Sequence, residues 1–198
     1  EFLLEHDLRE RALAEIVAAR GNTPETADAH MQMADLLRRA GDPRSALDEF
    51  EHALRLAPSD ARALAGAGEA AFAIRDYSTA ARELKRVTSL DPRLREIRDI
   101  ASLVVTRDPL APHLGPGERR RRLAADLEDV RQRLAACMVQ SSPIAATPLS
   151  RRLDQDAMED AIERIARAED RIAHECAMAT PLDRALAIIA GQHTGGAG

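Results

Sequence analysis

Four consecutive arginines at positions 119–122 form the densest group of side chains that could do chemistry. Guanidinium groups bind phosphates and carboxylates, so such a run could meet nucleic acid or an acidic partner. Consecutive residues of a helix point in four directions, however, and do not form one patch. No aromatic side chain accompanies the run for base stacking, and acidic neighbours neutralise part of it: Glu118, Asp126, Glu128 and Asp129. We therefore expect no nucleic-acid binding.

The two cysteines and six histidines do not suggest a metal site. Cys137 and Cys176 are too few for a disulfide scaffold and lack the spacing of zinc ligands. If their helices form an antiparallel hairpin, the two residues lie about 30 Å apart, so we expect two buried free thiols. A disulfide would need a different helix arrangement and a place outside the cytoplasm. His174 and Cys176 are two apart on a helix and do not face one site, so we expect no metal and no cofactor.

Acidic residues are plentiful, but they do not form a catalytic pattern. They alternate with Arg at helical spacings, as in Glu159, Glu163 and Arg167, which is typical of a solvated face with salt bridges. The sequence contains no G-x-S-x-G motif, no phosphate-binding loop and no dinucleotide fingerprint. We therefore expect that the protein is not an enzyme.

Three equally spaced prolines reveal how the first half of the chain is organised. Pro24, Pro58 and Pro92 are separated by 34 residues each. Before each proline, small and large apolar residues recur at spacings of three and four, which predicts one buried helix face. These residues are Ala12, Ile16 and Ala19 before the first proline, Ala46, Phe50 and Ala53 before the second, and Ala80, Leu84 and Val87 before the third.

The helices before Pro58 and Pro92 are each preceded by a partner helix. A turn separates the two helices of each pair. The partner helices carry His30, Met33, Ala34 and Leu37 in one repeat and Leu64, Ala67, Gly68 and Phe72 in the next. The turns are AGDP at positions 40–43 and RDYS at positions 75–78. Gly41 suits the left-handed position that ends a helix, Asp42 can cap the next helix, and Pro43 fits its first turn.

These features resemble the tetratricopeptide repeat family, whose 34-residue pattern is W-x-x-L-G-x-x-Y, then A-x-x-x-F, then P. The resemblance covers residues 25–58 and 59–92 as two repeats, and residues 1–24 as a partial repeat. His30 and Leu64 stand where Trp is preferred, and Ala34 where Gly is preferred. The resemblance implies an all-α solenoid of helix pairs. About three pairs are needed for a stable stack, so we expect a fragment of a longer protein that continues towards the N-terminus. A degenerate N-terminal cap is the alternative.

The resemblance also implies a concave groove lined by the first helix of each pair, where a peptide or helix of a partner would bind. A plain solvated face is the alternative. The variant of the family that clamps a chaperone's C-terminal carboxylate is not expected, because Asp35 and Glu69 are acidic and Met31 and Ala65 are apolar. The residues expected to face the groove are Asp28, Met31, Gln32, Asp35, Arg38, Arg39, Arg62, Ala65, Glu69, Ala73 and Ile74.

Apolar periodicity predicts further helices after the repeats. A helix at 93–107 would cap the stack, with Leu94, Ile97, Ile100, Ala101, Val104 and Val105 buried, and residues 108–117 would form a linker. The C-terminal region, 118–190, would contain helices at 118–139 and 152–178, joined by a loop at 141–150 into an antiparallel hairpin. A short helix from Pro181 to Ala190 and a flexible tail, 191–198, would follow.

Bulk composition adds only broad limits. The net charge of −5 gives no overall attraction to nucleic acid or anionic membranes, and no apolar run approaches a membrane span. Lys85 is the only lysine among 28 basic residues, which together with the Ala and Arg content indicates a bacterial, high-GC source. We expect a soluble scaffold or adaptor, favouring the cytoplasm over the periplasm, that binds a protein or peptide. The alternatives are self-assembly through the C-terminal helices and a regulatory arm of a larger protein.

Overall fold

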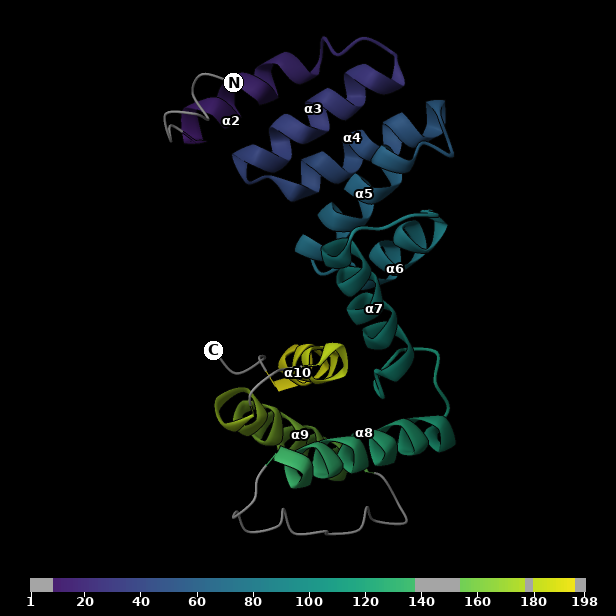
Figure 1. Ribbon diagram of the computed structural model, residues 1–198, viewed down its shortest axis with the longest axis vertical. Coiled ribbons are helices and arrows are strands. Elements are labelled where there is room, and N and C mark those ends of the chain that lie inside the picture. The colour runs from purple at the N-terminus through teal and green to yellow at the C-terminus, as the bar shows by residue number, and fades with distance from the viewer. Residues whose placement is uncertain (1–8, 138–153, 177–179, 195–198) are drawn as a thin grey trace. The chain divides into compact units, whose positions relative to one another are not determined.

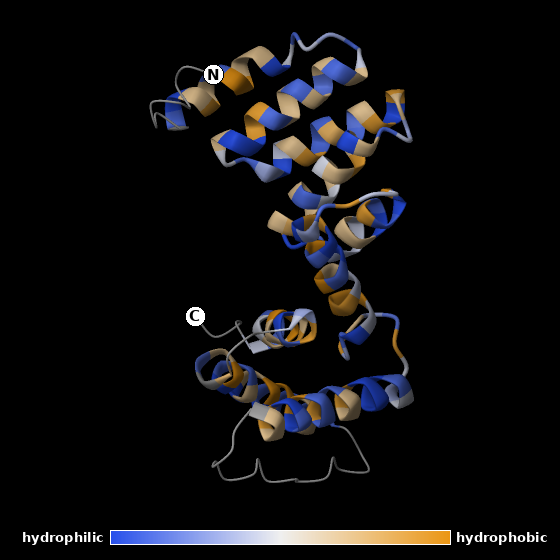
Figure 2. Cartoon of the chain, in the orientation of Figure 1, coloured by the Kyte–Doolittle hydropathy of each residue, from blue (hydrophilic) through white to orange (hydrophobic). Residues whose placement is uncertain are grey.

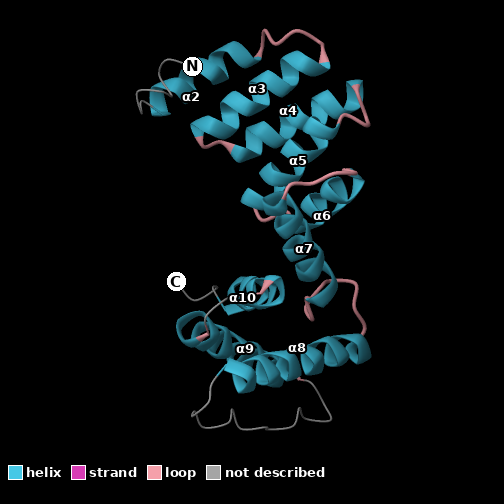
Figure 3. Ribbon diagram, in the orientation of Figure 1, coloured by secondary structure: helices cyan, strands magenta, loops and turns pink. Residues whose placement is uncertain are grey.

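The computed structural model describes residues 9–137, 154–176 and 180–194, and these residues form nine helices joined by loops, with no strand (Figure 3). The chain divides into two compact units, residues 1–102 and residues 103–198. Within each helix, hydrophilic and hydrophobic residues alternate around the axis (Figure 2), as expected for helices that bury one face. Within the described residues, no helix combines the length and apolarity needed to cross a membrane.

The first unit is a stack of consecutive helices (Figure 1). Each of these helices packs against the next along the chain from α2 to α6, and α3 also contacts α5. The helices are α2 (Arg9–Arg20), α3 (Ala27–Ala40), α4 (Pro43–Leu56), α5 (Ala61–Ala73), α6 (Tyr77–Arg86) and the start of α7 (Pro92–Arg107).

The N-terminal caps of these helices repeat at the same 34-residue interval as the prolines. Thr26 and Asp60 cap α3 and α5, and their side-chain oxygens accept hydrogen bonds from backbone N–H groups of the first turn. Asp42 and Asp76 cap α4 and α6 in the same way, each at 3.0 Å from the amide nitrogen three residues later. The caps satisfy amides that have no partner inside the helix, and they fix where each helix starts.

The C-terminal ends of α3 and α5 also correspond, although their residues differ. Gly41 has a φ of 87°, and Arg75, 34 positions later, has a φ of 66°. In both turns the next residue, Asp42 or Asp76, donates its amide to a carbonyl five residues back. The left-handed backbone suits Gly41 but is strained for Arg75, which has a Cβ atom.

The core of the stack depends on close approach between small and large residues. A Cβ atom on Gly66 would lie 2.3 Å from the ring of Phe50, and one on Gly68 would lie 2.4 Å from Cγ of Leu84. These glycines therefore let α5 approach α4 and α6. The other predicted core residues include Ala34, Leu37, Ala46, Ala53, Ala67 and Ala80, all fully buried.

Some residues that the sequence pattern placed in the core are not buried. Ala19 is exposed, whereas its predicted companions Ala12 and Ile16 are buried. In α7, Ile100, Ala101 and Val104 are buried but Val105 is 43% exposed. Both errors have one cause, because a helix residue at the edge of an apolar stripe satisfies the periodicity without facing a neighbour.

The second unit contains the end of α7 and three further helices, of which α9 packs against both others. They are α8 (Pro116–Cys137), α9 (Gln155–Glu175) and α10 (Pro181–Thr194). Arg119 in α8 and Met158 in α9 line one pocket near the start of both helices. Near the other end, Arg133 of α8 bonds to Asp183 at 3.1 Å, and both charges act on Glu169 near the end of α9. Hence α8 and α9 are parallel.

The predicted antiparallel hairpin of these two helices is therefore wrong. The C-terminal hairpin is instead formed by α9 and α10, which run in opposite directions. At the far end of α10, His193 lies 3.0 Å from Asp108, the residue that follows α7.

The parallel arrangement also overturns the prediction about the cysteines. Cys176, immediately after α9, is disulfide-bonded, and none of the cysteines is free in the described part of the chain. The predicted separation of about 30 Å assumed antiparallel helices. Parallel helices instead bring the end of α9 to the end of α8, which stops at Cys137.

Several predicted boundaries shift. α10 continues four residues beyond the predicted end at Ala190, so positions 191–194 of the predicted tail are helical, and Thr194 Oγ1 donates to the Ala190 carbonyl at 2.9 Å. α8 begins at Pro116, inside the predicted linker. The predicted loop 141–150 lies outside the described residues.

Candidate partner-binding site

The predicted groove residues lie on α3 and α5, which contact one another. At the N-terminal ends of these helices, Arg62 Nη2 donates to Asp28 Oδ1 at 3.0 Å. These two residues are 34 positions apart, so the pair joins equivalent turns of the two repeats. Both side chains are about three-quarters exposed, so the pair marks the surface and adds little stability.

At the C-terminal ends of the same helices the surface is hollowed into a pocket of about 450 Å³, called here the inner pocket. Its charged residues are Arg38 of α3, Glu69 of α5 and Arg93 of α7. Glu69 is the central one, since its carboxylate lies 2.5 Å from Arg93 Nη2 and 3.8 Å from Arg38 Nη1. Arg38 also lies 3.5 Å from Asp35 at the rim.

The remaining lining of the inner pocket is mostly apolar. It is formed by Gly41, Pro43, Ala70, Phe72, Ala73 and Ile97. Phe72 is held on its other side by an edge-on contact with Tyr77, whose ring centroid is 5.4 Å away. Ala73 is exposed and small, so it leaves the pocket open towards solvent. The site thus offers apolar surface beside a fixed set of two guanidinium groups and one carboxylate.

The structure brings together only part of the predicted groove. Arg38, Glu69 and Ala73 line the inner pocket, and Asp35 contacts its edge. Gln32 and Arg39 are exposed, and Ala65 and Ile74 are partly exposed. Met31, by contrast, is 6% exposed and belongs to the core, because in α3 it lies on the face that carries the buried Ala34.

Sequence reasoning missed the contribution of α7 and of the turn between α3 and α4. Arg93 and Ile97 follow Pro92 at the start of α7, and Pro43 starts α4. The proline spacing places α7 after the second repeat, which could have indicated that its first turns reach α5. The pairing of Arg93 with Glu69, 24 positions earlier, has no signal in the sequence.

A buried charged cluster holds α3 against α2 and α4. Glu49 of α4 is 4% exposed. Its carboxylate oxygens lie 2.5 Å from Arg20 Nε of α2 and 2.7 Å from His30 Nδ1 of α3. Burial raises the pKa of Glu49, but the hydrogen bonds from His30 and Arg20 outweigh that effect, so its pKa is lowered overall. His30 also stacks on His52, with ring centroids 5.0 Å apart. The cluster thus holds the inner face of α3 through a buried carboxylate whose pKa is lowered.

The inner pocket has the chemistry of a recognition site. Among the described residues that line it, none is a Ser, Thr, Cys or His that could act as a nucleophile or general base. Nowhere in the described ranges do three or more His, Cys, Asp or Glu residues come together to hold a metal ion. Apolar contact and charge-assisted hydrogen bonds are the interactions that the pocket can offer a ligand.

Comparison with known proteins is consistent with this geometry. Residues 37–103 match the family model for the tetratricopeptide repeat, a span that contains α4, α5 and α6 and most of the inner pocket. No curated protein and no solved structure matches the chain. The predicted all-α solenoid of tetratricopeptide type is confirmed. Repeats of this family generally mediate protein–protein interactions.

Proposed function

We propose that residues 25–92 bind a segment of a partner protein across α3 and α5, with the inner pocket as the anchor. Binding is reversible, and the protein makes or breaks no bond in the partner. The observation that carries the proposal is the convergence of Arg38, Glu69 and Ala73, three of the predicted groove residues, on one pocket. A few partner side chains that insert deeply into such a pocket supply most of the affinity of an interface.

The lining indicates what the anchor of the partner looks like. Phe72, Ala73 and Ile97 provide apolar contact for one large side chain, because about 450 Å³ is enough for an aromatic or long aliphatic group. Arg38, Glu69 and Arg93 surround it with both signs of charge. A polar or charged neighbour of the anchor would then fix the orientation of the segment.

A peptide library displayed on phage and selected against the full chain tests this proposal. Ala73→Trp fills the inner pocket, and we expect it to weaken the selected peptides at least tenfold by titration calorimetry. Arg55→Glu is the matched control, because Arg55 is exposed on α4 and does not line the pocket. Equal binding by wild type and Ala73→Trp would overturn the proposal.

Self-assembly through the C-terminal helices is the alternative, and the packing of α9 argues against it. Self-assembly requires that the apolar stripe of α9 is accessible to a second chain. The residues of this stripe are buried, however, and α9 packs against both α8 and α10. The stripe consists of Ala161, Ile162, Ile165, Ala168 and Ile172. We expect light scattering at several concentrations to report a constant monomer mass; a stable dimer would instead favour assembly.

The disulfide at Cys176 bears on the compartment in which this binding would take place. Disulfides persist in oxidising compartments and are rare in the cytoplasm. We therefore propose an oxidising compartment, contrary to the preference drawn from the sequence. Thiol titration of the denatured, unreduced protein checks the disulfide, with no reactive thiol expected.

A further inference from the structure

Arg119 differs from the other members of the run at 119–122 in what it contacts. Arg121 and Arg122 both pair with Glu118, and Arg122 also donates to the Asp108 carbonyl at 3.1 Å. Arg119 Nε donates to the Leu114 carbonyl oxygen at 3.1 Å. Within the described ranges, no carboxylate lies within salt-bridge distance of Arg119. Arg119 therefore differs from Arg121 and Arg122, because its side chain lines a pocket and does not pair with Glu118.

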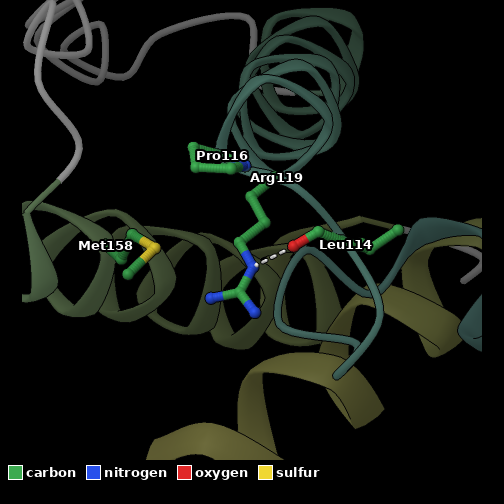
Figure 4. Close-up of a pocket in the computed structure, with 4 residues that line it drawn as sticks. All are labelled: Leu114, Pro116, Arg119 and Met158. Atoms are coloured by element: carbon green, nitrogen blue, oxygen red, sulfur yellow. Dashed lines mark hydrogen bonds between the residues drawn. The ribbon is translucent and has the colours of Figure 1, made fainter.

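This second pocket, the Arg119 pocket, has a volume of about 310 Å³ and is lined by Leu114, Pro116, Arg119 and Met158. Figure 4 shows the guanidinium of Arg119 projecting from α8 into the space between Leu114 and Met158 of α9. The hydrogen bond from Nε holds the guanidinium in place, and the two terminal nitrogens remain as donors. Among the residues that the structure describes, the other three lining side chains are apolar and none is acidic.

We propose that the Arg119 pocket binds a carboxylate carried on a short apolar stem. The planar guanidinium matches the geometry of a carboxylate and gives charge-assisted hydrogen bonds. Leu114 and Pro116 offer apolar contact to the stem, and the thioether of Met158 adapts to its shape. A half-buried guanidinium among apolar groups is stabilised by a counter-charge, which a ligand of this class supplies.

Other anions fit the lining less well. A phosphate group is usually held by several donors, whereas the described part of the lining offers one guanidinium beside three apolar residues. Nucleic acid would also need stacking partners, and none of the described lining residues is aromatic. The carboxylate could come from a free aliphatic acid or from the C-terminus of a protein chain that ends in an apolar residue. The site is separate from the inner pocket, so it stands or falls independently of the proposed function.

Hexanoate is the first probe, tested on the full chain by saturation-transfer NMR and by the methyl resonance of Met158. We expect a saturable shift of the Met158 methyl group with hexanoate and none with hexanol. Arg119→Gln should weaken hexanoate at least tenfold, and Met158→Glu, which places a competing carboxylate beside Arg119, should do the same. Arg121→Gln is the matched control, since Arg121 lies two residues further along α8 and pairs with Glu118. This variant should bind hexanoate as the wild type does.

Two further ligands resolve the source and the class of the anion. The peptide acetyl-Ala-Ala-Leu with a free C-terminus, compared with its amide, tests the chain-end source, and tighter binding than hexanoate would assign it. Tighter binding of hexanoate would assign a free acid. Equal shifts with hexanol, unchanged binding in both Arg119→Gln and Met158→Glu, or preference for inorganic phosphate would overturn the proposal.

Discussion

Glu49 in α4 and Glu169 in α9 are buried to nearly the same extent, 4% and 5% exposed, yet the two units favour opposite charge states for them. In the first unit, Arg20 and His30 both contact the Glu49 carboxylate, and its pKa is lowered. In the second unit, burial raises the pKa of Glu169 to about 8, with the charge of Asp183 adding to the effect and Arg133 opposing it. One oxygen of Glu169 has no hydrogen-bond partner.

Asp126 extends the contrast. It is fully buried in α8, and burial raises its pKa to about 6 although Arg107 Nε donates to it at 2.7 Å. The first unit thus gives its buried Glu49 two side-chain partners, Arg20 and His30, whereas the second unit leaves one oxygen of Glu169 and one oxygen of Asp126 without a hydrogen-bond partner. A carboxylate whose pKa is lowered by folding stabilises at neutral pH, and one whose pKa is raised stabilises only when protonated. The two units should therefore respond to pH in opposite directions.

The largest expected effect is the pH dependence of the C-terminal unit. Glu169 has an ordinary value of 4.5 when unfolded and about 8 when folded, so its stabilising effect is complete below pH 4.5 and is lost as pH rises towards 8. From pH 5 to pH 8 we expect the unfolding free energy of α9 to fall by roughly 3 kcal/mol. Glu169→Gln should remove this slope.

Amide hydrogen exchange of α9, corrected for intrinsic rates, measures that slope in the full chain. Glu163→Gln is the matched control, since Glu163 is exposed on the same helix, and it should keep the wild-type slope. A flat profile for wild type between pH 5 and pH 8 would contradict the raised pKa.

The next effect concerns the close packing of the repeat unit. Gly68→Ala places a Cβ atom 2.4 Å from the buried Leu84, and we expect a loss of about 2 kcal/mol despite the better helix propensity of Ala. Gly191→Ala in α10 meets nothing within 4 Å and should gain about 0.5–1 kcal/mol. Urea unfolding of both variants gives the comparison, and equal changes would mean that close approach at Gly68 is unimportant.

The buried cluster around Glu49 should give a somewhat smaller loss. Glu49→Gln removes the charge that Arg20 and His30 contact, and we expect a cost of about 1.5 kcal/mol at pH 7. Because the folded pKa is lowered, the wild-type advantage persists above the unfolded pKa and disappears as pH falls through the folded one. Unfolding at a series of pH values from 7 downwards measures this, with exposed Glu51→Gln as the control. An advantage that does not decline as pH falls would argue against charge as the cause.

The smallest effect tests backbone strain at the repeat turns. Arg75→Gly relieves a residue held at a φ of 66°, and we expect a gain of about 0.5–1 kcal/mol. Gly41→Ala introduces the same strain at the equivalent turn and should lose about 1 kcal/mol. Thermal unfolding of the two variants should therefore shift the midpoint in opposite directions. Shifts of the same sign would contradict the equivalence of the turns.

Most of the local structure of the first unit follows directly from its sequence. Caps, turn residues and the spacing of small and large apolar side chains act within one helix or between neighbouring helices, so a 34-residue period contains most of the information needed. The sequence also predicted one shared surface for Arg38, Glu69 and Ala73, and these three residues line the inner pocket. Arg93 and Ile97 could not be assigned, because their contact with α5 depends on how α7 docks rather than on any repeated position.

The arrangement of helices in the second unit, by contrast, depends on packing that the sequence pattern does not specify. Periodicity shows which face of α8, α9 and α10 is apolar, but a stripe packs equally well against a parallel or an antiparallel neighbour. That choice set the bonding of Cys176, the burial of Glu169 and the meeting of Arg119 with Met158. Contacts between residues far apart in sequence carry no period, so they follow from the docking of whole helices.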